Sequence, residues 1–240
     1  MTNFKGKTIL ITGGTGSFGE FFVDYLQGKD FKEVRVFSRD EMKQEQMRQR
    51  LNSSKIKFYI GDIRDRSSLD NAIIGVNYIF HAAALKQVPT CEFFPTQAMQ
   101  TNVVGSQNVI DSAIQNEVER VVSLSTDKAV YPVNALGNTK ALMERMIQSV
   151  ARTIPDGKTV LSVVRYGNIL FTRGSVIPIF IKQIREKRPL TLTAPEMSRF
   201  WLPLSEAVEL VNFALEQGKQ GDIFIRKAAS STLEDIAKAL

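Results

Sequence analysis

The chain has 240 residues, of which 43% are hydrophobic, and this suffices for the core of one large α/β domain with a small appendage. Its formal charge of +6 favours an acidic ligand, but lysine and arginine are spread along the chain, so we expect a polyanionic small molecule and no nucleic acid. A single cysteine, Cys91, and a single histidine, His81, exclude an intrachain disulfide and a His-rich metal site, so no metal is expected.

The chain begins with a polar stretch and contains no apolar run as long as a membrane-spanning helix requires. Met1–Lys7 leads directly into a strand and not into the apolar segment of a signal peptide. The sequence therefore predicts a cytoplasmic protein without a membrane partner.

Short β-branched runs alternate with longer amphipathic stretches as far as Arg165. This alternation predicts a doubly wound parallel sheet with right-handed crossovers, the Rossmann type of α/β fold, and the continuous apolar character of the runs indicates a sheet covered on both faces. The predicted strands are Thr8–Thr12, Val34–Phe37, Lys57–Ile60, Tyr78–Phe80, Arg120–Leu124 and Val160–Val164. The predicted helices are Phe18–Gln27, Glu41–Leu51, Ser67–Ile73, Ala98–Gln115 and Gly137–Ala151.

Beyond Arg165 the pattern changes to a Gly-rich loop and shorter elements. We therefore divide the chain into a main domain, residues 1–168, and the start of a smaller C-terminal lobe, residues 169–240, interleaved with it. Because the last helix has no Gly or Pro stop signal before Leu240, we expect the lobe to be truncated and the chain to be a fragment. The elements expected after Arg165 are a helix near Ile177–Lys187, a strand Leu190–Thr193, a helix near Ser205–Gln217, a strand Asp222–Ile225 and a helix from Thr232.

A glycine cluster joins the first strand to the first helix. Its glycines allow a tight turn and a close approach of the backbone to a pyrophosphate, while the helix N-terminus supplies N–H donors and a positive dipole. Because the cluster lies between a buried strand and a helix, it predicts a dinucleotide site in the main domain. The residues assigned to this site are Gly13, Thr15, Gly16, Ser17, Phe18 and Gly19.

The end of the second strand indicates which dinucleotide binds. Arg39 and Lys43, which follow Ser38, can hold a 2′-phosphate by bidentate hydrogen bonds and by charge, so NADP is favoured over NAD. Asp40 and Glu41 have a simpler explanation, because negative charge at the start of a helix offsets the helix dipole.

The next two strand ends complete the predicted cofactor site. Asp62, with Ile63 beside it, follows the third strand, where a carboxylate can accept a hydrogen bond from the adenine amino group. Ala82, Ala83 and Ala84 follow the fourth strand, and such small side chains let a dinucleotide lie close to the backbone.

Together these segments resemble the UDP-N-acetylglucosamine 4,6-dehydratases of bacterial surface-glycan synthesis, which are extended short-chain dehydrogenases/reductases. The resemblance is greatest to the C5-inverting enzymes of the flagellin-sugar and capsule branches, and it covers nearly the whole chain. Its most specific part is Leu-Ser-Thr-Asp-Lys, because many unrelated short-chain dehydrogenases share only the glycine loop. The matching segments are Thr12–Gly19, Ser38–Lys43, Gly61–Asp65, His81–Lys86, Leu124–Lys128, Arg165–Asn168, Arg173–Val176 and Ser198–Phe200.

The resemblance implies an NADP-dependent hydro-lyase that acts as a homo-oligomer on UDP-N-acetylglucosamine. In that reaction a hydride leaves C4 for the cofactor, the C5 proton is removed, water is lost from C6, and the hydride returns to C6. Inversion at C5 gives a UDP-4-keto-6-deoxy-L-sugar, which would supply capsule or O-antigen synthesis.

Asp127 and Lys128, at the end of the fifth strand, offer the acid and the base that this chemistry needs. The resemblance assigns Asp127 as the C6 acid and Lys128 as the C5 base, while the spacing leaves open which carries which proton. A solvated ion pair is the structural alternative. The resemblance further implies that Thr126 binds the sugar O4 and that Lys140 bridges the nicotinamide ribose.

The segment before Lys140 departs from the general dehydrogenase pattern. Leu136 stands where most members carry the catalytic tyrosine, and leucine has no proton to exchange. The 4-hydroxyl proton must then pass to Lys128, Asp127, a water or the nearby Tyr131. Alternatively, the protein has lost turnover and is a sensor that only binds NADP or a nucleotide sugar.

A further group of residues is predicted on the sugar-nucleotide side. Asn168 follows the sixth strand on the side where open α/β sheets bind ligands, and Arg173 and Arg199 can neutralise a pyrophosphate. By resemblance, Asn102 supports the active-site backbone, although a helix-interior amide explains it equally well. The substrate set is Lys86, Asn168, Arg173, Ser175, Val176 and Arg199.

A UDP-sugar 4-epimerase is the second enzyme hypothesis, because it shares the oxidation at C4 but returns the hydride to the same carbon. An epimerase needs no acid at C6. The presence of Asp127 and Lys128, where two small hydroxylated residues would be expected, therefore favours the dehydratase.

Overall fold

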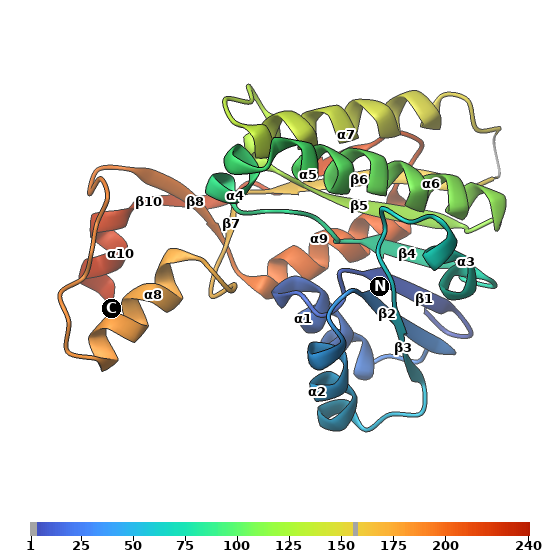
Figure 1. The fold of residues 1–240 in the computed structure, drawn as a ribbon, viewed down its shortest axis with the longest axis horizontal. Helices are drawn as coiled ribbons and strands as arrows, with labels where there is room; N and C mark the ends of the chain where they lie inside the picture. The colour runs from blue at the N-terminus through green and yellow to red at the C-terminus, as the bar shows by residue number, and fades with distance from the viewer. Residues whose placement is uncertain (1–3, 156–157) are drawn as a thin grey trace.

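Seven parallel strands form the central sheet of the protein, whose computed structural model describes residues 4–155 and 158–240 (Figure 1). Their order across the sheet is β3-β2-β1-β4-β5-β6-β9, which confirms the predicted doubly wound α/β fold. The order reverses direction between β1 and β4, and this places a ligand-binding crevice at the carboxyl ends of the strands. The strands are β1 (Thr8–Thr12), β2 (Glu33–Ser38), β3 (Ile56–Ile60), β4 (Tyr78–His81), β5 (Arg120–Thr126), β6 (Val160–Tyr166) and β9 (Ile223–Ile225).

Helices cover both faces of this sheet because successive strand side chains point to opposite sides. Ile9 and Ile11 of β1 belong to the same buried cluster as Phe22, whereas Leu10 belongs to the cluster on the other face with Val109. Full burial of each such side chain stabilises the fold by about 1.5–3 kcal/mol. One face carries α1 (Ser17–Gln27), α2 (Glu41–Leu51) and α9 (Leu204–Gln217), and the other carries α3 (Ser67–Ile73), α6 (Gly105–Gln115) and α7 (Ala135–Ala151).

The segment between β4 and α6 is more broken than the sequence predicts. In place of one helix over Ala98–Gln115, the structure has α4 (Val88–Phe93), α5 (Pro95–Met99) and a π-helical turn, Gln100–Val104, before α6. The two short helices each begin with a proline near the first position, where the missing N–H has no helical partner to lose. In the described part of the chain, no helix is long and apolar enough to cross a membrane.

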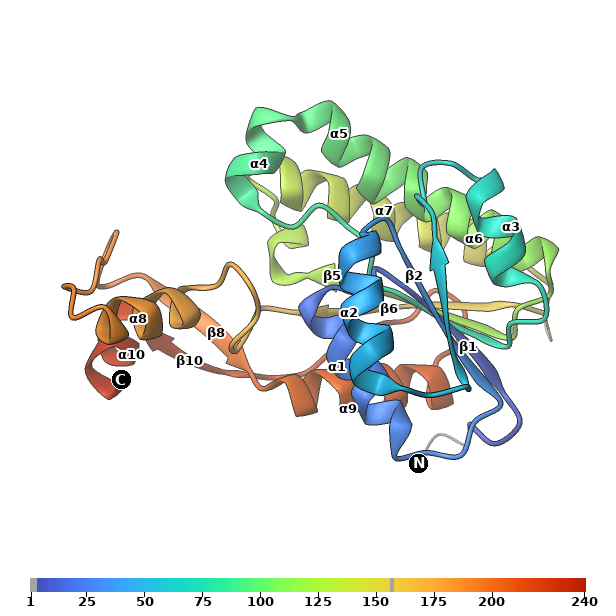
Figure 2. The ribbon, with the colours of Figure 1, turned by 60° about the horizontal axis from the view of Figure 1, so that its bottom comes forward.

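A three-stranded sheet and two helices form the smaller lobe, which projects from one end of the main sheet (Figure 2). Between β8 and β10 the chain returns to the main sheet through α9 and β9, so the two parts are interleaved along the chain. The lobe elements are β7 (Asn168–Ile169), α8 (Val176–Arg185), β8 (Ser198–Leu202), β10 (Ala229–Thr232) and α10 (Leu233–Ala239).

The predicted strand Leu190–Thr193 is wrong, because no strand includes these residues. Instead, the side chain of Gln183 binds Thr191 twice: its Nε2 donates to Thr191 Oγ1 at 2.8 Å, and its Oε1 accepts from the Thr191 backbone at 3.3 Å. A side chain thus takes the hydrogen bond that a neighbouring strand would have taken. The strand of this region is β8, whose aromatic run in Ser198–Leu202 pairs with β7 and β10.

His81, the last residue of β4, is fully buried. The Ser106 hydroxyl donates to the carbonyl of Asn102 at 2.7 Å, so it accepts from His81 Nε2 at 2.8 Å. His81 Nδ1 then accepts from the Thr12 hydroxyl at 2.6 Å. Burial, aided by the positive charge of Lys140, lowers the pKa of His81 to about 3, so the ring stays neutral.

We expect His81 to make the protein less stable in mild acid. The pKa of His81 is about 3 in the folded protein, below the ordinary value of 6.5. Between these two pH values the imidazole is protonated in the unfolded chain but stays neutral in the folded one. Stability is therefore full above about pH 6.5 and falls as the pH drops towards 3, by about 2 kcal/mol at pH 5. Urea unfolding at pH 7 and pH 5 measures this loss. His81→Gln should lose less over the same interval, and equal losses in both proteins would contradict the assignment.

Candidate active site

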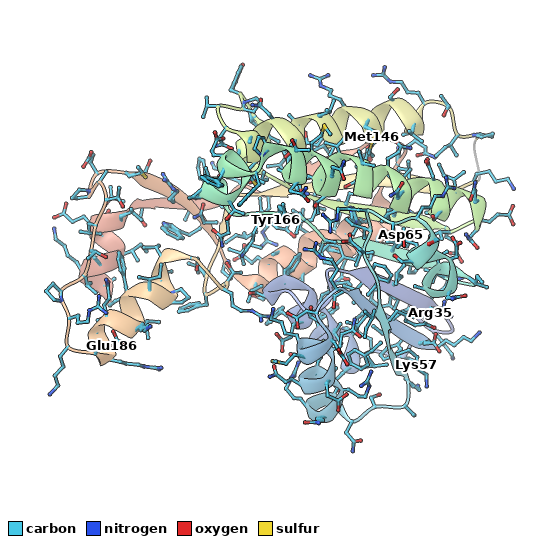
Figure 3. The ribbon with its side chains drawn as sticks, in the orientation of Figure 1. Arg35, Lys57, Asp65, Met146, Tyr166 and Glu186 are labelled. Atoms are coloured by element: carbon cyan, nitrogen blue, oxygen red, sulfur yellow. The ribbon has the colours of Figure 1, made fainter. Side chains whose placement is uncertain are left out.

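A cleft of about 820 Å³ runs along the carboxyl ends of the central strands and reaches the first turn of the smaller lobe. Residues after β1, β2, β3, β4, β5 and β6 all line it. Tyr166, the last residue of β6, lies where the chain passes from the main sheet into the lobe (Figure 3). The cleft therefore brings together segments that are far apart in sequence, as expected at the switch point of a doubly wound sheet.

The glycine loop forms one end of the cleft floor. Gly13 has a φ of +67°, and a Cβ at this position would lie 2.7 Å from the amide nitrogen of Ala83. A Cβ on Gly19 would lie 2.6 Å from the carbonyl oxygen of Gly13, so α1 packs directly on the loop. The six residues predicted in this loop all line the cleft. The loop is thus a backbone cradle whose shape and N–H donors fit a pyrophosphate.

The adenosine end of the cleft is lined by Arg39, Lys43 and Asp62, as well as Ser38 and Ile63. Asp40 caps α2, where it accepts from the Lys43 backbone at 3.0 Å, and it also pairs with the Lys43 ammonium. The Arg39 side chain is 54% exposed and approaches Asp62 only to 3.5 Å. The carboxylate nearest the end of β2 is therefore committed to the helix, while Arg39 keeps most of its hydrogen-bonding capacity.

The Asp62 carboxylate forms ion pairs with Arg64 and Arg39. Its carboxylate accepts from Arg64 Nε at 2.9 Å and from the Arg64 backbone at 3.0 Å. Burial acts to raise the pKa of Asp62, but the hydrogen bonds from Arg64 and the charge of Arg39 outweigh it and hold the pKa below its ordinary value. Asp62 is therefore a charged acceptor at the place predicted for adenine.

The other end of the cleft contains the predicted catalytic strand end. β5 ends at Thr126 and passes into one turn of 3₁₀ helix, Asp127–Ala129. The Thr126 hydroxyl donates to Asp127 Oδ1 at 2.9 Å, and Lys128 Nζ donates to the same oxygen at 3.0 Å. Thr126 and Lys128 line the cleft, but Asp127 does not. The Asp127 carboxylate therefore binds the Thr126 hydroxyl and the Lys128 ammonium through the same oxygen atom.

Helix α7 fixes this turn from the side. Gly137 approaches the carbonyl oxygen of Lys128 so closely that a Cβ there would clash with it. Lys140, one turn further on and 5% exposed, donates from Nζ to the carbonyl of Leu124 at 2.8 Å. Burial lowers the pKa of Lys140 to about 8, against the smaller opposing effect of Glu144. A buried lysine with this pKa is typical of functional sites.

The residue at the usual tyrosine position faces the cleft without any proton to give. Leu136 lines the cleft, is 5% exposed and packs with Cys91 and Ala98. Tyr131 is 92% exposed and is absent from the cleft lining, so the structure does not bring it to the site. The phenol that does line the cleft is Tyr166, which the sequence analysis missed. Its hydroxyl is buried with no partner among the described residues, and burial raises its pKa well above the ordinary value.

Asn102 supports the loop that lines the middle of the cleft. Its Oδ1 accepts from the backbone nitrogen of Leu85 at 2.9 Å, and its Nδ2 donates to the carbonyl of Leu85 at 3.0 Å. Nδ2 also donates to Thr139 Oγ1 at 3.1 Å, so the same amide links this loop to α7. Asn102 lies in the π-helical turn, and such turns often occur at functional sites. Of the two explanations given for this residue, the structure has the backbone support.

The predicted substrate residues divide into two groups. Lys86, Asn168, Arg173 and Ser175 line the cleft together with Ala82, Ala83 and Ala84. Arg199 does not line it, and instead donates from Nη1 to the carbonyl of Ser198 at 2.7 Å. Val176 begins α8 outside the lining. The unpredicted residues that also line the cleft include Gln87, Val88, Pro89 and Thr172, none of which carries a motif that sequence alone would single out.

A dinucleotide cradle, a buried lysine on α7 and a cleft shared with a C-terminal lobe define the class of extended short-chain dehydrogenases/reductases. A family model described as "Polysaccharide biosynthesis protein" matches residues 9–240, and the chain belongs to this family.

Relatives and solved structures agree with this assignment. The chain is 56% identical to a protein of Rickettsia rickettsii (strain Sheila Smith) named UDP-glucose 4-epimerase, over 99% of this chain and 71% of the relative. It is 39% identical to Pen from Bacillus thuringiensis, with a TM-score of 0.94 over 98% of this chain and 72% of that one. DesIV, a dTDP-glucose 4,6-dehydratase of Streptomyces venezuelae solved with NAD and TYD bound, is 23% identical over 97% of this chain and 79% of that one, and its TM-score of 0.87 shows a shared fold alone.

These comparisons overturn the expected hydro-lyase. The relatives that are 56% identical along 99% of the chain, from Rickettsia rickettsii and Rickettsia prowazekii, are named as epimerases, which are isomerases. The sequence argument relied on Asp127 and Lys128 as an acid and base pair. In the structure Lys128 lines the cleft, and the Asp127 carboxylate is bound to Thr126 and Lys128 through Oδ1.

We expect Asn102→Leu to loosen the middle of the cleft. The leucine removes both hydrogen bonds to Leu85 and leaves its backbone N–H and carbonyl without these partners, at a cost of about 1–3 kcal/mol per unpaired group. Urea unfolding should show this loss, and calorimetry should show weaker dinucleotide binding. Asn116→Leu is the matched control, because its amide binds the Ser112 carbonyl at the end of α6 and lies outside the cleft lining. An Asn102 variant as stable as the wild type would contradict the supporting role.

Proposed function

We propose that the protein is a UDP-sugar 4-epimerase that retains NADP during turnover. The identity of 56% with proteins named UDP-glucose 4-epimerase carries this proposal, because it extends over 99% of the chain and so includes the whole cleft. UDP-glucose is the first substrate to consider, and UDP-N-acetylglucosamine is the second. The positive charge of Lys86 and Lys128 along the cleft suits the diphosphate of either sugar nucleotide.

The residues of the cleft fit a dinucleotide from end to end. The glycine loop would hold the pyrophosphate, Arg39 and Lys43 the 2′-phosphate, Asp62 the adenine, and Lys140 the nicotinamide ribose. When bound, the nicotinamide supplies reversible hydride transfer at C4. NADP is favoured over NAD because Asp40 is engaged as the cap of α2, and no other acidic residue follows β2 on the cleft wall before α2 begins.

An epimerase at C4 needs one group that takes and returns a single proton. Lys128 is the candidate, because it lines the cleft while Tyr131 does not. Its ammonium donates to Asp127 Oδ1, so it would first pass a proton to that carboxylate and then take the 4-hydroxyl proton as a neutral amine. The Thr126 hydroxyl, whose proton is directed to Asp127 and which accepts from the Lys128 backbone at 3.4 Å, keeps one lone pair to accept from the sugar 4-hydroxyl. Asp127 then acts as a positioning residue, because its Oδ1 fixes the side chains of Thr126 and Lys128 relative to each other. An acid at C6 has no part in this reaction, which agrees with a carboxylate that is engaged by Thr126 and Lys128.

The proposal predicts interconversion without loss of mass. Purified protein supplied with NADP and UDP-glucose should produce UDP-galactose, measured by the anomeric proton signals. With deuterium at C4 of the substrate, the label should remain at C4 of the product, since the hydride returns to its own carbon. Folded protein that binds NADP but interconverts neither UDP-glucose nor UDP-N-acetylglucosamine would refute the proposal, and so would a product that has lost water.

Lys128→Met should abolish turnover while binding persists. Removing a positioned acid–base group lowers kcat by about 10²–10⁴-fold, whereas the affinity for UDP-glucose should change only slightly because the cleft keeps its other cations. Lys128→Arg keeps the charge but cannot accept a proton at neutral pH, so it should be nearly as slow. Lys182→Met, on the exposed side of α8, is the matched control. If the wild type binds NADP and UDP-glucose but converts neither UDP-glucose nor UDP-N-acetylglucosamine, the sensor hypothesis is favoured instead. The structural basis of that hypothesis is Leu136, which stands in place of the catalytic tyrosine.

A further inference from the structure

A second, smaller cavity of about 210 Å³ lies beside the adenosine end of the main cleft, between α1 and α2. Three residues line both cavities: Thr15 of the glycine loop, Lys43 of α2, and Arg173 of the smaller lobe. They therefore form the wall that separates the two spaces. Two of these residues belong to the predicted cofactor site, but Arg173 comes from the turn that enters the lobe.

Arg173 is fastened to the glycine loop and not to the substrate end of the cleft. Its backbone nitrogen and its Nε both donate to the Ser17 hydroxyl, at 3.0 and 3.3 Å. Its Nη2 donates to the carbonyl of Thr15 at 2.7 Å and to Glu20 at 3.1 Å. A single side chain thus connects the first turn of the lobe to the loop that cradles the pyrophosphate.

The rest of this turn is also held in place. Lys86 Nζ donates to the carbonyl of Arg173 at 3.0 Å, and Ser175 donates to Thr172 through both its backbone nitrogen and its hydroxyl. Gly174 has a φ of +75°, and a Cβ there would run into the Gln87 side chain. The turn therefore presents the Arg173 guanidinium in a defined orientation.

The guanidinium still has donors to offer. Among the described residues, no hydrogen bond is made by Nη1 of Arg173, although a guanidinium has five N–H donors. Its ion-pair partner, Glu20, is shared with Arg50, whose Nη2 lies 3.1 Å from the other carboxylate oxygen. Arg50 also pairs with Asp24 at 2.8 Å, so the charges of the two arginines are balanced, and what Arg173 can offer a ligand is the unused Nη1 side of its guanidinium.

The position of this wall indicates which anion would meet it. In doubly wound domains the adenosine ribose lies at the end of β2, and here the residues beyond that end are Arg39, Asp40 and Lys43. Asp40 is bound to the backbone and side chain of Lys43, so it is not available to the ribose hydroxyls. A phosphate on the 2′-oxygen would face Lys43 and the free side of Arg173.

We propose that Arg173 is a specificity-determining residue for the cofactor, which binds the 2′-phosphate of NADP from the lobe side and thereby ties the lobe to the dinucleotide. This inference rests on the NADP preference in the proposed function and revises the assignment of Arg173 to the sugar nucleotide. The main domain alone supplies Arg39 and Lys43, and the lobe supplies the third cation. Binding of NADP, but not of NAD, then adds a contact that holds the entry turn of the lobe over the glycine loop.

Binding measurements on the purified protein test this inference without any turnover. Calorimetric titrations with NADP, NAD and UDP compare the wild type with Arg173→Gln. The control is Arg188→Gln, because Arg188 is an ion-paired arginine of the lobe that lines neither cavity. Arg173→Gln should weaken NADP binding by about tenfold or more, because hydrogen bonds to a charged group are lost. The affinities for NAD and UDP should stay within about twofold, and the control should match the wild type.

A second variant keeps the test decisive if Arg173→Gln does not fold. Arg173→Lys retains the charge but not the planar fork, so its affinity for NADP should lie between those of the wild type and the glutamine variant. Equal losses for NADP and NAD, unchanged NADP binding, or a loss confined to UDP would each overturn the inference. A wild type that prefers NAD would refute the NADP preference itself. Failure of epimerisation would refute the proposed reaction but leave these affinities intact.

Discussion

The structure depends on how closely the loop after β1 can approach the loop after β4. At Gly13 the chain turns with a left-handed φ of +67°, and the missing side chain leaves room for the backbone of Ala82 and Ala83. The Gly13 N–H binds the carbonyl of Phe37 at 2.8 Å, so the end of β2 is attached to the same turn. Three strand ends are thereby brought within reach of one ligand, and any side chain at this position would push them apart.

The opposite end of the cleft is organised by α7, which touches β5 through polar groups. Lys140 binds the carbonyl of Leu124, and Glu144 one turn later accepts from the hydroxyl of Ser125 and from Arg165 of β6. These buried charges have partners, as charges in a protein interior must. Because the partners lie on the residues just before Thr126 and Tyr166, the helix fixes where both strands end. The shape of this end of the cleft therefore follows from the hydrogen bonds that α7 makes to the two strands.

The main sheet and the dinucleotide loop could be predicted from sequence because their signals are local. Apolar runs such as Ile9-Leu10-Ile11 and the glycines that follow them need no knowledge of the rest of the chain. The smaller lobe gave weaker signals: β7 has two residues, β10 is polar, and the segment around Leu190 is held by a glutamine side chain instead of a neighbouring strand. Pairings between distant segments decide such elements, and no period in the sequence records them.

The residues of the candidate active site show the same difference between local signals, which the sequence reveals, and long-range arrangement, which it does not. Arg39 and Asp62 were predicted from their position next to strand ends, Thr126 was predicted from the family resemblance, and all three line the cleft. Tyr166 was missed because a tyrosine at the end of a buried strand looks like packing. The direction of a side chain at such a turn likewise cannot be predicted from sequence spacing, and Asp127 and Arg199, which were predicted in the site, are not among the residues that line the cleft.

The same limit explains why the reaction type was wrong while the chemical class was right. Oxidation at C4 is common to epimerases and dehydratases, so a cofactor loop, a lysine on α7 and a polar strand end are expected in both. What separates the two reactions is whether a second acid reaches C6, and adjacent residues on a chain need not face the same space. In this protein a 3₁₀ turn follows β5, Lys128 lines the cleft, and Asp127 binds Thr126 and Lys128 through one oxygen. Under the proposed reaction, the acidic residue that the sequence assigns to C6 would instead hold the two groups that act on the 4-hydroxyl.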